Sequence, residues 1–250
     1  MKGKTGFSVR RYRMFHQGQD LKYFRVVVKE TDLHVGIDRD GYRQGIEDEV
    51  ERLVVRLRGD LETYIEMHPE FKTSLIPVMC LPHAPLIVRA MTQAAWLAGV
   101  GPMAAVAGAI AQEVGEFLGH RHNDVIVENG GDLFVKTSRE RVVGIWAGDT
   151  PFQNKLGLKV RPEESSLGIC SSSATIGPSL SFGKADVALV KAQDSTLADA
   201  VATALGNRVQ GEDTLVEALR CALAVPGVKG ALVIMKDKMA AQGEIELVRL

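Results

Sequence analysis

The chain has 250 residues, of which 46% are hydrophobic and 24% are charged, and its formal net charge is −1 at pH 7. This length can bury a sizeable core, and the balanced charge excludes the strongly basic surface that is typical of nucleic-acid-binding proteins. Three cysteines lie far apart, at Cys80, Cys170 and Cys221. Their spacing favours neither a disulfide framework nor a zinc site, so reduced cytoplasmic thiols are the simpler interpretation.

No apolar segment follows Met1, so we expect no secretory signal and predict a cytoplasmic protein. Residues 94–111 are rich in Ala, Gly and Val, which is also typical of a membrane span. Pro102 interrupts this stretch, however, and Glu113 and Glu116 follow it closely. We therefore predict a buried helix that begins at Pro102, and no membrane partner.

The first half of the sequence predicts short strands followed by helices. Aromatic and β-branched residues favour strands over residues 12–15, 23–28 and 32–37. Apolar residues at helical spacing from Ile46 to Ile65 predict a long amphipathic helix. After a proline-rich connector, further helices are expected over residues 86–97 and from Pro102 to about Leu118.

The second half predicts more strands than helices. The strands are expected over residues 124–128, 133–136, 141–147, 155–160, 187–191, 230–235 and 244–248, and the helices over residues 197–205 and 214–224. The whole pattern predicts an α+β fold in which antiparallel or mixed sheets are covered by helices. We expect a single domain over residues 1–250, and the alternative is two tightly packed halves of about 1–122 and 123–250.

A polar stretch between the predicted strands contains candidate phosphate ligands. Small hydroxyl residues lie beside glycines there, and their backbone N–H groups suit a phosphate or a carboxylate. These residues are Ser171, Ser172, Ser173 and Thr175. Lys184 follows and could meet a phosphate as a point charge. The alternatives are a polar loop that satisfies its own backbone and a solvated lysine at a strand end.

Asp199 and Thr203 are candidate metal ligands. Their spacing of i and i+4 places a carboxylate and a hydroxyl on the same face of the predicted helix. Both are hard oxygen ligands of the kind that Mg²⁺ prefers. The alternative is an ordinary helix start, with Ser195 or Thr196 as the N-cap and Asp199 favoured by the helix dipole. We expect Asn207 to be a C-cap rather than a ligand.

The motif from Asn129 to Asp132, with sequence NGGD, lies between two predicted strands. Glycines supply positive φ angles, and Asn and Asp favour turns, so the spacing alone predicts a hairpin or bulge turn. A ligand-binding role is the alternative.

The NGGD motif and the ADAVAT motif at residues 198–203 resemble the NxGGD and ADAxAT signatures of the ApbE-like superfamily. Its best-known members are Mg²⁺-dependent flavin transferases. Residues 171–186, SSSATIGPSLSFGKAD, resemble an uncharacterised cytoplasmic branch of that superfamily. The resemblance covers roughly residues 101–207. It implies an ApbE-like fold, Mg²⁺ bound by Asp199 and Thr203, and a flavin nucleotide pocket lined by Asn129, Gly130, Gly131 and Asp132.

The resemblance also implies a function, which is Mg²⁺-dependent transfer of FMN from FAD to a hydroxyl of an acceptor protein. The flavin transferases carry a His-Asp-Pro type segment between the two motifs, whereas no histidine follows His122 in this sequence. This departure favours two alternatives. One is a non-catalytic protein that binds a flavin or another nucleotide-like small molecule. The other is a role in sulfide or homocysteine assimilation, in which Cys170 would take part.

Overall fold

The computed structural model describes residues 19–173 and 183–250. The strand expected over residues 12–15 and the candidate ligand Thr175 lie outside these ranges. The described strands are β1 (Leu21–Val28), β2 (Thr31–Asp38), β3 (Val125–Asn129), β4 (Asp132–Lys136), β5 (Arg141–Gly144), β6 (Leu156–Val160), β7 (Leu167–Ser172), β8 (Val187–Ala192), β9 (Val228–Met235), β10 (Lys238–Gly243) and β11 (Leu247–Arg249). The described helices are α1 (Ile46–Met67), α2 (Glu70–Thr73), α3 (Leu86–Ala98), α4 (Val106–Gly119), α5 (Ser195–Arg208) and α6 (Leu215–Leu223), with short 3₁₀ turns η2 (Arg39–Gly41), η3 (Pro102–Ala105), η4 (Pro162–Glu164) and η5 (Glu212–Thr214).

Eight of these strands form one antiparallel sheet in the order β1-β2-β3-β4-β7-β8-β9-β10. Neighbouring strands follow each other along the chain except at one place, where β5 and β6 leave the sheet between β4 and β7. They pair with each other and with β11 in a three-stranded antiparallel sheet. The α+β class with antiparallel sheets covered by helices is therefore confirmed.

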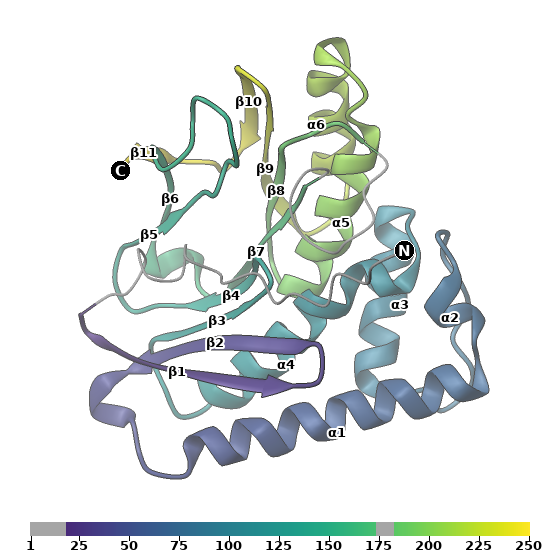
Figure 1. Cartoon of the computed structure of the whole chain (residues 1–250), viewed down its shortest axis with the longest axis vertical. Coiled ribbons are helices and arrows are strands. Elements are labelled where there is room, and N and C mark those ends of the chain that lie inside the picture. The colour runs from purple at the N-terminus through teal and green to yellow at the C-terminus, as the bar shows by residue number, and fades with distance from the viewer. Residues whose placement is uncertain (1–18, 174–182) are drawn as a thin grey trace, which may run out of the picture.

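The large sheet separates two hydrophobic cores, because successive side chains of a strand point to opposite faces. On β8, Ala188 and Val190 face the core shared with the helices. Val187 and Leu189 face the smaller core, which the three-stranded sheet and the loop after β5 complete. In Figure 1 the long helix α1 crosses beneath β1 and β2, and α5 lies against β7 and β8.

Two strands were missed by the sequence patterns. The stretch at residues 171–173 was expected to belong to a polar loop, but Ser171 and Ser172 end the strand β7. Burial on both faces removes the alternation of polar and apolar residues that marks a strand, and β7 is buried at every position except Ser171. The other missed strand, β10, is an edge strand made mostly of exposed residues.

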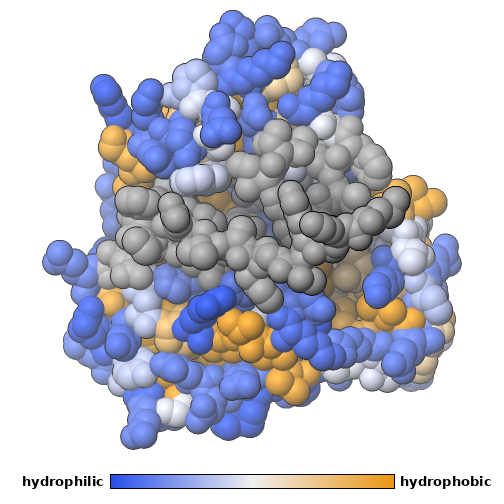
Figure 2. All heavy atoms as spheres, in the orientation of Figure 1, coloured by the Kyte–Doolittle hydropathy of each residue, from blue (hydrophilic) through white to orange (hydrophobic). Residues whose placement is uncertain are grey.

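Most of the surface visible in Figure 2 belongs to hydrophilic residues. In the described part of the chain no single helix is both long and apolar enough to cross a membrane. The segments Leu86–Ala98 and Pro102–Gly119 meet the length and composition criteria only as a pair, and they are bent by 104° at their junction. The predicted helix start at Pro102 takes the form of the 3₁₀ turn η3, which leads into α4.

Candidate functional site

The NGGD motif forms the turn between β3 and β4, as its spacing predicts. Asn129 pairs with Asp132, and the two glycines between them have φ angles of 72° and 107°. A two-residue hairpin loop with positive φ at both positions requires residues such as glycine. The Glu128 carboxylate accepts a hydrogen bond from the Gly131 N–H at 2.9 Å, and the Asn129 side-chain amide donates to the Ala107 carbonyl at 3.0 Å. The turn is thereby joined to the first turn of α4.

Asp199 extends from α5 to the same turn of α4. Its Oδ2 accepts a hydrogen bond from the Gly108 N–H at 2.8 Å. A negative charge at a helix N-terminus is favoured by the helix dipole. This approach needs a glycine, because a Cβ at position 108 would lie 2.2 Å from the Ser195 carbonyl oxygen and 2.7 Å from the Asp199 Cβ.

Asp132 and Asp199 form a pair of carboxyl groups with strong mutual influence. Asp132 is only 7% exposed, and its Oδ1 has no hydrogen-bond partner among the described residues. Burial, followed by the charge of Asp199, raises the pKa of Asp132 well above its usual value. Burial also raises the pKa of Asp199 to about 7, although its hydrogen bonds from the backbone of α4 act in the opposite direction. The pair therefore favours a bound proton or cation.

Cys170 lies on β7 against this pair and is fully buried. Its Sγ donates a hydrogen bond to the Ser195 carbonyl at 3.4 Å. Burial raises the pKa of the Cys170 thiol well above its usual value, and the charges of Asp132 and Asp199 raise it further. The thiol is therefore held protonated. This is typical of a cysteine that serves as a small buried side chain, and it opposes a nucleophilic role.

The serines predicted as phosphate ligands lie at the end of β7. Ser171 is exposed, and its hydroxyl donates a hydrogen bond to the Gly131 carbonyl at 3.5 Å, so it adjoins the hairpin turn. Ser172 is buried at 8% exposure, and Ser173 follows the strand. The structure thus brings Ser171 next to the NGGD turn.

Thr203 lies farther along α5, and Lys184 lies beside the C-terminal end of that helix. Thr203 is partly buried one turn after Asp199, on the face that the i, i+4 spacing indicates. Lys184 is exposed, and its N–H donates to the Val209 carbonyl at 2.7 Å, beyond the C-terminal end of α5. At 1.5 Å per helical residue this position is about 15 Å from Asp199 along the helix axis. The backbone of Lys184 is therefore at the other end of α5 from Asp199.

The C-cap expected at Asn207 was wrong, and so was the alternative that placed the N-cap of α5 at Ser195 or Thr196. The N-cap is Asp194, whose side chain accepts a hydrogen bond from the Leu197 N–H at 2.8 Å. Ser195 and Thr196 already belong to the helix, and the Ser195 hydroxyl donates to the Leu133 carbonyl instead. Asn207 lies inside the last turn, because the helix continues to Arg208. Asp194 therefore provides the N-cap of α5, and the Asp199 carboxylate interacts with α4 instead.

Sequence reasoning missed Gly108 and Glu128 as parts of this region. Gly108 lies in a run of small residues for which close packing is typical, but the sequence gives no signal for its contact with Asp199. In the described part of the chain, no group of three or more His, Cys, Asp or Glu side chains could hold a metal ion. Mg²⁺ usually needs only one or two carboxylates, since it keeps several waters. The carboxylates of Asp132 and Asp199 and the hydroxyl of Thr203 offer hard oxygen atoms, a ligand chemistry that suits Mg²⁺ better than a transition metal.

Comparison with known proteins places these features in a wider context. A family model described as AbpE bacteria matches residues 13–239. A UPF0280 protein of Methanocella arvoryzae is 46% identical over 195 residues, which cover 77% of this chain and 78% of the relative. A UPF0280 protein of Methanocaldococcus jannaschii is 38% identical over 231 residues, which cover 90% of this chain and 92% of the relative.

Solved structures share the same fold. The flavin transferase ApbE from Vibrio cholerae superposes with a TM-score of 0.62 at 12% identity, and the match covers 90% of this chain and 97% of that one. The apo form of the Pseudomonas stutzeri flavinyl transferase ApbE gives a TM-score of 0.57 at 13% identity and covers 89% and 94% of the two chains. At such identities the likeness is one of fold.

Proposed function

This chain belongs to the AbpE bacteria family, and from this premise we propose that it binds a flavin dinucleotide with Mg²⁺ and transfers FMN from FAD to a protein hydroxyl. The main support for the proposal is the pair of carboxyl groups of Asp132 and Asp199, which are both buried near the start of α4. Two carboxylates in such a place are compatible with the folded state when a cation accompanies them.

Asp199 and Thr203 would hold the Mg²⁺, with Asp132 as the second negative charge beside it. The Asp132 Oδ1 is buried without a hydrogen bond among the described residues, as expected of an atom that meets a cation or a proton. The bound ion would neutralise charge on the diphosphate as the phosphorus–oxygen bond breaks. The hydrogen bond from Gly108 fixes the orientation of the Asp199 carboxylate for this role.

The phosphate contacts would come from hydroxyls at the end of β7 rather than from the amides of the hairpin turn. The Gly131 N–H already donates to Glu128, so it is not available to an anion. The exposed Ser171 hydroxyl lies beside this turn and could donate to an anion. The NGGD turn would thus shape the wall of the site, while Ser171 and Ser173 contact the diphosphate.

Transfer requires that an acceptor hydroxyl attack the FMN-side phosphorus while AMP leaves. The hydroxyl must lose its proton, and the Asp132 carboxylate would accept it. Asp132 belongs to the NGGD turn that borders the proposed site, which makes its carboxylate the candidate base. The burial of this region also excludes water that would otherwise compete with the acceptor.

The test is a titration of the protein into FAD with and without Mg²⁺, followed by measurement of flavin fluorescence and of released AMP. We expect Mg²⁺-dependent binding that falls at least tenfold in Asp199→Asn, because the amide still accepts the Gly108 hydrogen bond but lacks the charge. Asp60→Asn, which changes an exposed carboxylate on α1, is the matched control. Equal Mg²⁺-dependent affinity in wild type and Asp199→Asn would contradict the metal role.

One alternative has specific support. The chain has no histidine after His122, although the flavin transferases carry one between the two motifs. FAD binding that is never followed by AMP release, with serine and threonine peptides offered as acceptors, would favour a flavin-binding protein without transferase activity. The buried and protonated state of Cys170 gives no support to a sulfur-assimilation role for its thiol.

A further inference from the structure

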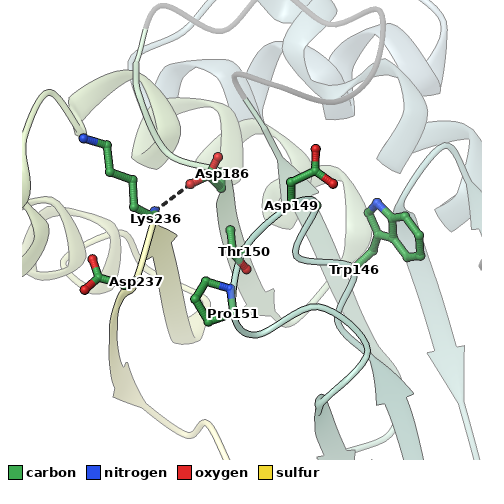
Figure 3. Close-up of a pocket in the computed structure, with 8 residues that line it drawn as sticks. Trp146, Asp149, Thr150, Pro151, Asp186, Lys236 and Asp237 are labelled. Atoms are coloured by element: carbon green, nitrogen blue, oxygen red, sulfur yellow. Dashed lines mark hydrogen bonds between the residues drawn. The ribbon is translucent and has the colours of Figure 1, made fainter.

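A separate pocket lies where the loop after β5 meets the start of β8 and the end of β9. Its volume is about 610 Å³. Three segments line it, namely the loop after β5, the residue before β8 and the turn between β9 and β10. Its lining includes Trp146, Asp149, Thr150, Asp186 and Lys236 (Figure 3).

The loop after β5 forms a fixed wall. Ile145 and Ala147 are buried in the smaller core, so Trp146 between them points outward and is 39% exposed. The Thr150 hydroxyl accepts a hydrogen bond from the Phe152 N–H at 3.3 Å, and the Thr150 carbonyl accepts one from the Gln153 N–H at 3.1 Å. These local bonds hold the loop in a defined conformation. The backbone that carries Trp146 and Asp149 is thus anchored on one side by the buried Ile145 and Ala147 and on the other by the turn at Thr150.

The opposite wall is fixed by Asp186. Its N–H donates to the Ile234 carbonyl at 2.9 Å, and its Oδ2 accepts a hydrogen bond from the Lys236 N–H at 2.7 Å. Lys236 has a φ of 56°, a conformation that costs energy for a residue other than glycine. The bond from Asp186 stabilises this turn. It occupies one carboxylate oxygen and leaves the Asp186 charge in the pocket.

The charge of the pocket is negative. In Figure 3 the ammonium group of Lys236 points away from Asp149 and Trp146. Among the described residues, no ion pair involves Asp149 or Asp186, whereas Asp237 lies 3.6 Å from the Lys238 ammonium. The carboxylates of Asp149 and Asp186 and the indole of Trp146 therefore line the pocket, and the Lys236 ammonium does not point toward Asp149 and Trp146.

We propose that this pocket binds an organic cation, an ammonium or guanidinium group placed between Asp149, Asp186 and the indole of Trp146. Carboxylates bind such groups through charge-assisted hydrogen bonds, and an indole face attracts them through its quadrupole. A phosphate would be repelled by the two carboxylates. The cation comes either from a lysine or arginine side chain of a polypeptide or from a free polyamine, and both present the same chemistry.

The pocket is distinct from the carboxylate pair at Asp132 and Asp199. Asp132 lies on the same side of β4 as Phe134, which packs in the core shared with the helices, whereas the loop that carries Trp146 is anchored in the smaller core through Ile145 and Ala147. Asp132 is on β4 and Asp186 precedes β8, with β7 between them. The two positions are thus separated by two interstrand spacings of about 4.8 Å each. Cation binding at the pocket therefore stands whether or not the protein transfers a flavin.

The test uses the fluorescence of Trp146 in the variant Trp96→Phe, which leaves Trp146 as the single tryptophan of the chain. Spermidine, N-acetyl-arginine amide and a short lysine-containing peptide are titrated separately at low ionic strength. We expect a saturable change in Trp146 fluorescence with at least one of these cations. Binding should weaken about tenfold in Asp149→Asn and in Asp186→Asn, since each loses one charge–charge contact. Asparagine at position 186 keeps the acceptor for the Lys236 N–H.

The controls separate a specific pocket from general attraction to acidic surface. Asp60→Asn should leave the affinity unchanged, and MgCl₂ at matched ionic strength should not reproduce the fluorescence change. Saturation by the peptide but not by spermidine would identify a polypeptide as the source of the cation, and the reverse would identify a free polyamine. The proposal is overturned if none of the cations saturates, if both asparagine variants bind as the parent does, or if FAD rather than a cation gives the saturable change.

Discussion

At the scale of single residues, the defining feature is that Asp132 and Asp199 share one enclosed region and raise each other's cost of ionisation. The i, i+4 spacing in the sequence was enough to place Asp199 and Thr203 on one helical face. It could not reveal that Asp199 contacts Gly108, because that contact joins positions far apart in the chain. The family resemblance placed the NGGD turn at a flavin pocket and Mg²⁺ on Asp199 and Thr203, but it did not indicate that Asp132 and Asp199 interact, since no local pattern links a hairpin turn with a distant helix.

The raised pKa of Asp199 predicts a particular pH dependence of stability. Its value is about 7 in the folded protein against 3.8 for an ordinary aspartate, so the folded state binds a proton that the unfolded state has released. The resulting stabilisation is complete below pH 4 and is lost as the pH rises through 7. In metal-free buffer, the wild type should therefore lose on the order of 2–4 kcal/mol relative to Asp199→Asn between pH 4 and pH 8. Urea denaturation of both proteins across this range measures the difference, and parallel profiles would contradict it.

Replacement of Asp132 should have opposite effects on stability and on cation binding. Asp132→Asn replaces a buried carboxyl group, whose ionisation is opposed by burial and by the charge of Asp199, with a neutral amide, so in metal-free buffer at pH 8 we expect the free energy of unfolding to rise by about 1–3 kcal/mol. The increase in melting temperature that Mg²⁺ gives the wild type should be smaller in the variant, because one of the two charges is missing. Thermal denaturation with and without Mg²⁺ tests both statements. A variant that is destabilised and still gains the full Mg²⁺ effect would show that Asp132 has only a structural role.

At the scale of elements, the close approach of α4 and α5 determines whether the carboxylate pair forms. The small residues of α4 allow close packing, and the structure packs this helix against α5 as well as against β3 and β4. The partner could not be inferred from periodicity, because small residues are compatible with packing against either a sheet or a helix. The strand β7 was missed for a related reason, since Gly168 and Cys170 face α5 rather than solvent.

Gly108→Ala should separate these two helices. The added Cβ would lie 2.2 Å from the backbone oxygen of Ser195, which cannot move without shifting α5. We expect a loss of about 1–3 kcal/mol in the free energy of unfolding, together with a weaker response to Mg²⁺. Gly59→Ala is the matched control, because Gly59 lies in α1 with no atom within 4 Å of the added Cβ. That variant should gain about 0.5–1 kcal/mol, and equal effects of the two substitutions would refute the packing argument.

At the scale of the whole molecule, a buried ion pair connects the two sheets. Lys191 of β8 has a side chain that is only 2% exposed, and its ammonium pairs with Glu164 of η4. It also donates to the Glu244 carbonyl at 3.1 Å, just before β11. The sequence predicts the α+β class and most of the strands. It could not predict that β5 and β6 leave the large sheet, because strand order depends on contacts such as this one rather than on local pattern.

The two partners of this pair should respond unequally to substitution. Glu164→Gln leaves the buried Lys191 ammonium without a counter-charge, and we expect a loss of about 3 kcal/mol. Lys191→Met should cost less, because methionine keeps most of the apolar stem and Glu164, at 21% exposure, can still be hydrated. Urea denaturation of the two single variants and the double variant measures the difference. A larger loss in Lys191→Met would show that packing outweighs the buried charge.

The pairing of β11 with β6 has a consequence for how the protein is made. Leu247 pairs with Leu158, so the three-stranded sheet gains its third strand only from residues near position 250. During synthesis the large sheet can grow strand by strand, since most of its neighbours follow each other along the chain. The smaller sheet instead remains incomplete, with one side of β6 unpaired, until residues 247–249 leave the ribosome. Until then, that exposed edge can pair with a neighbouring molecule.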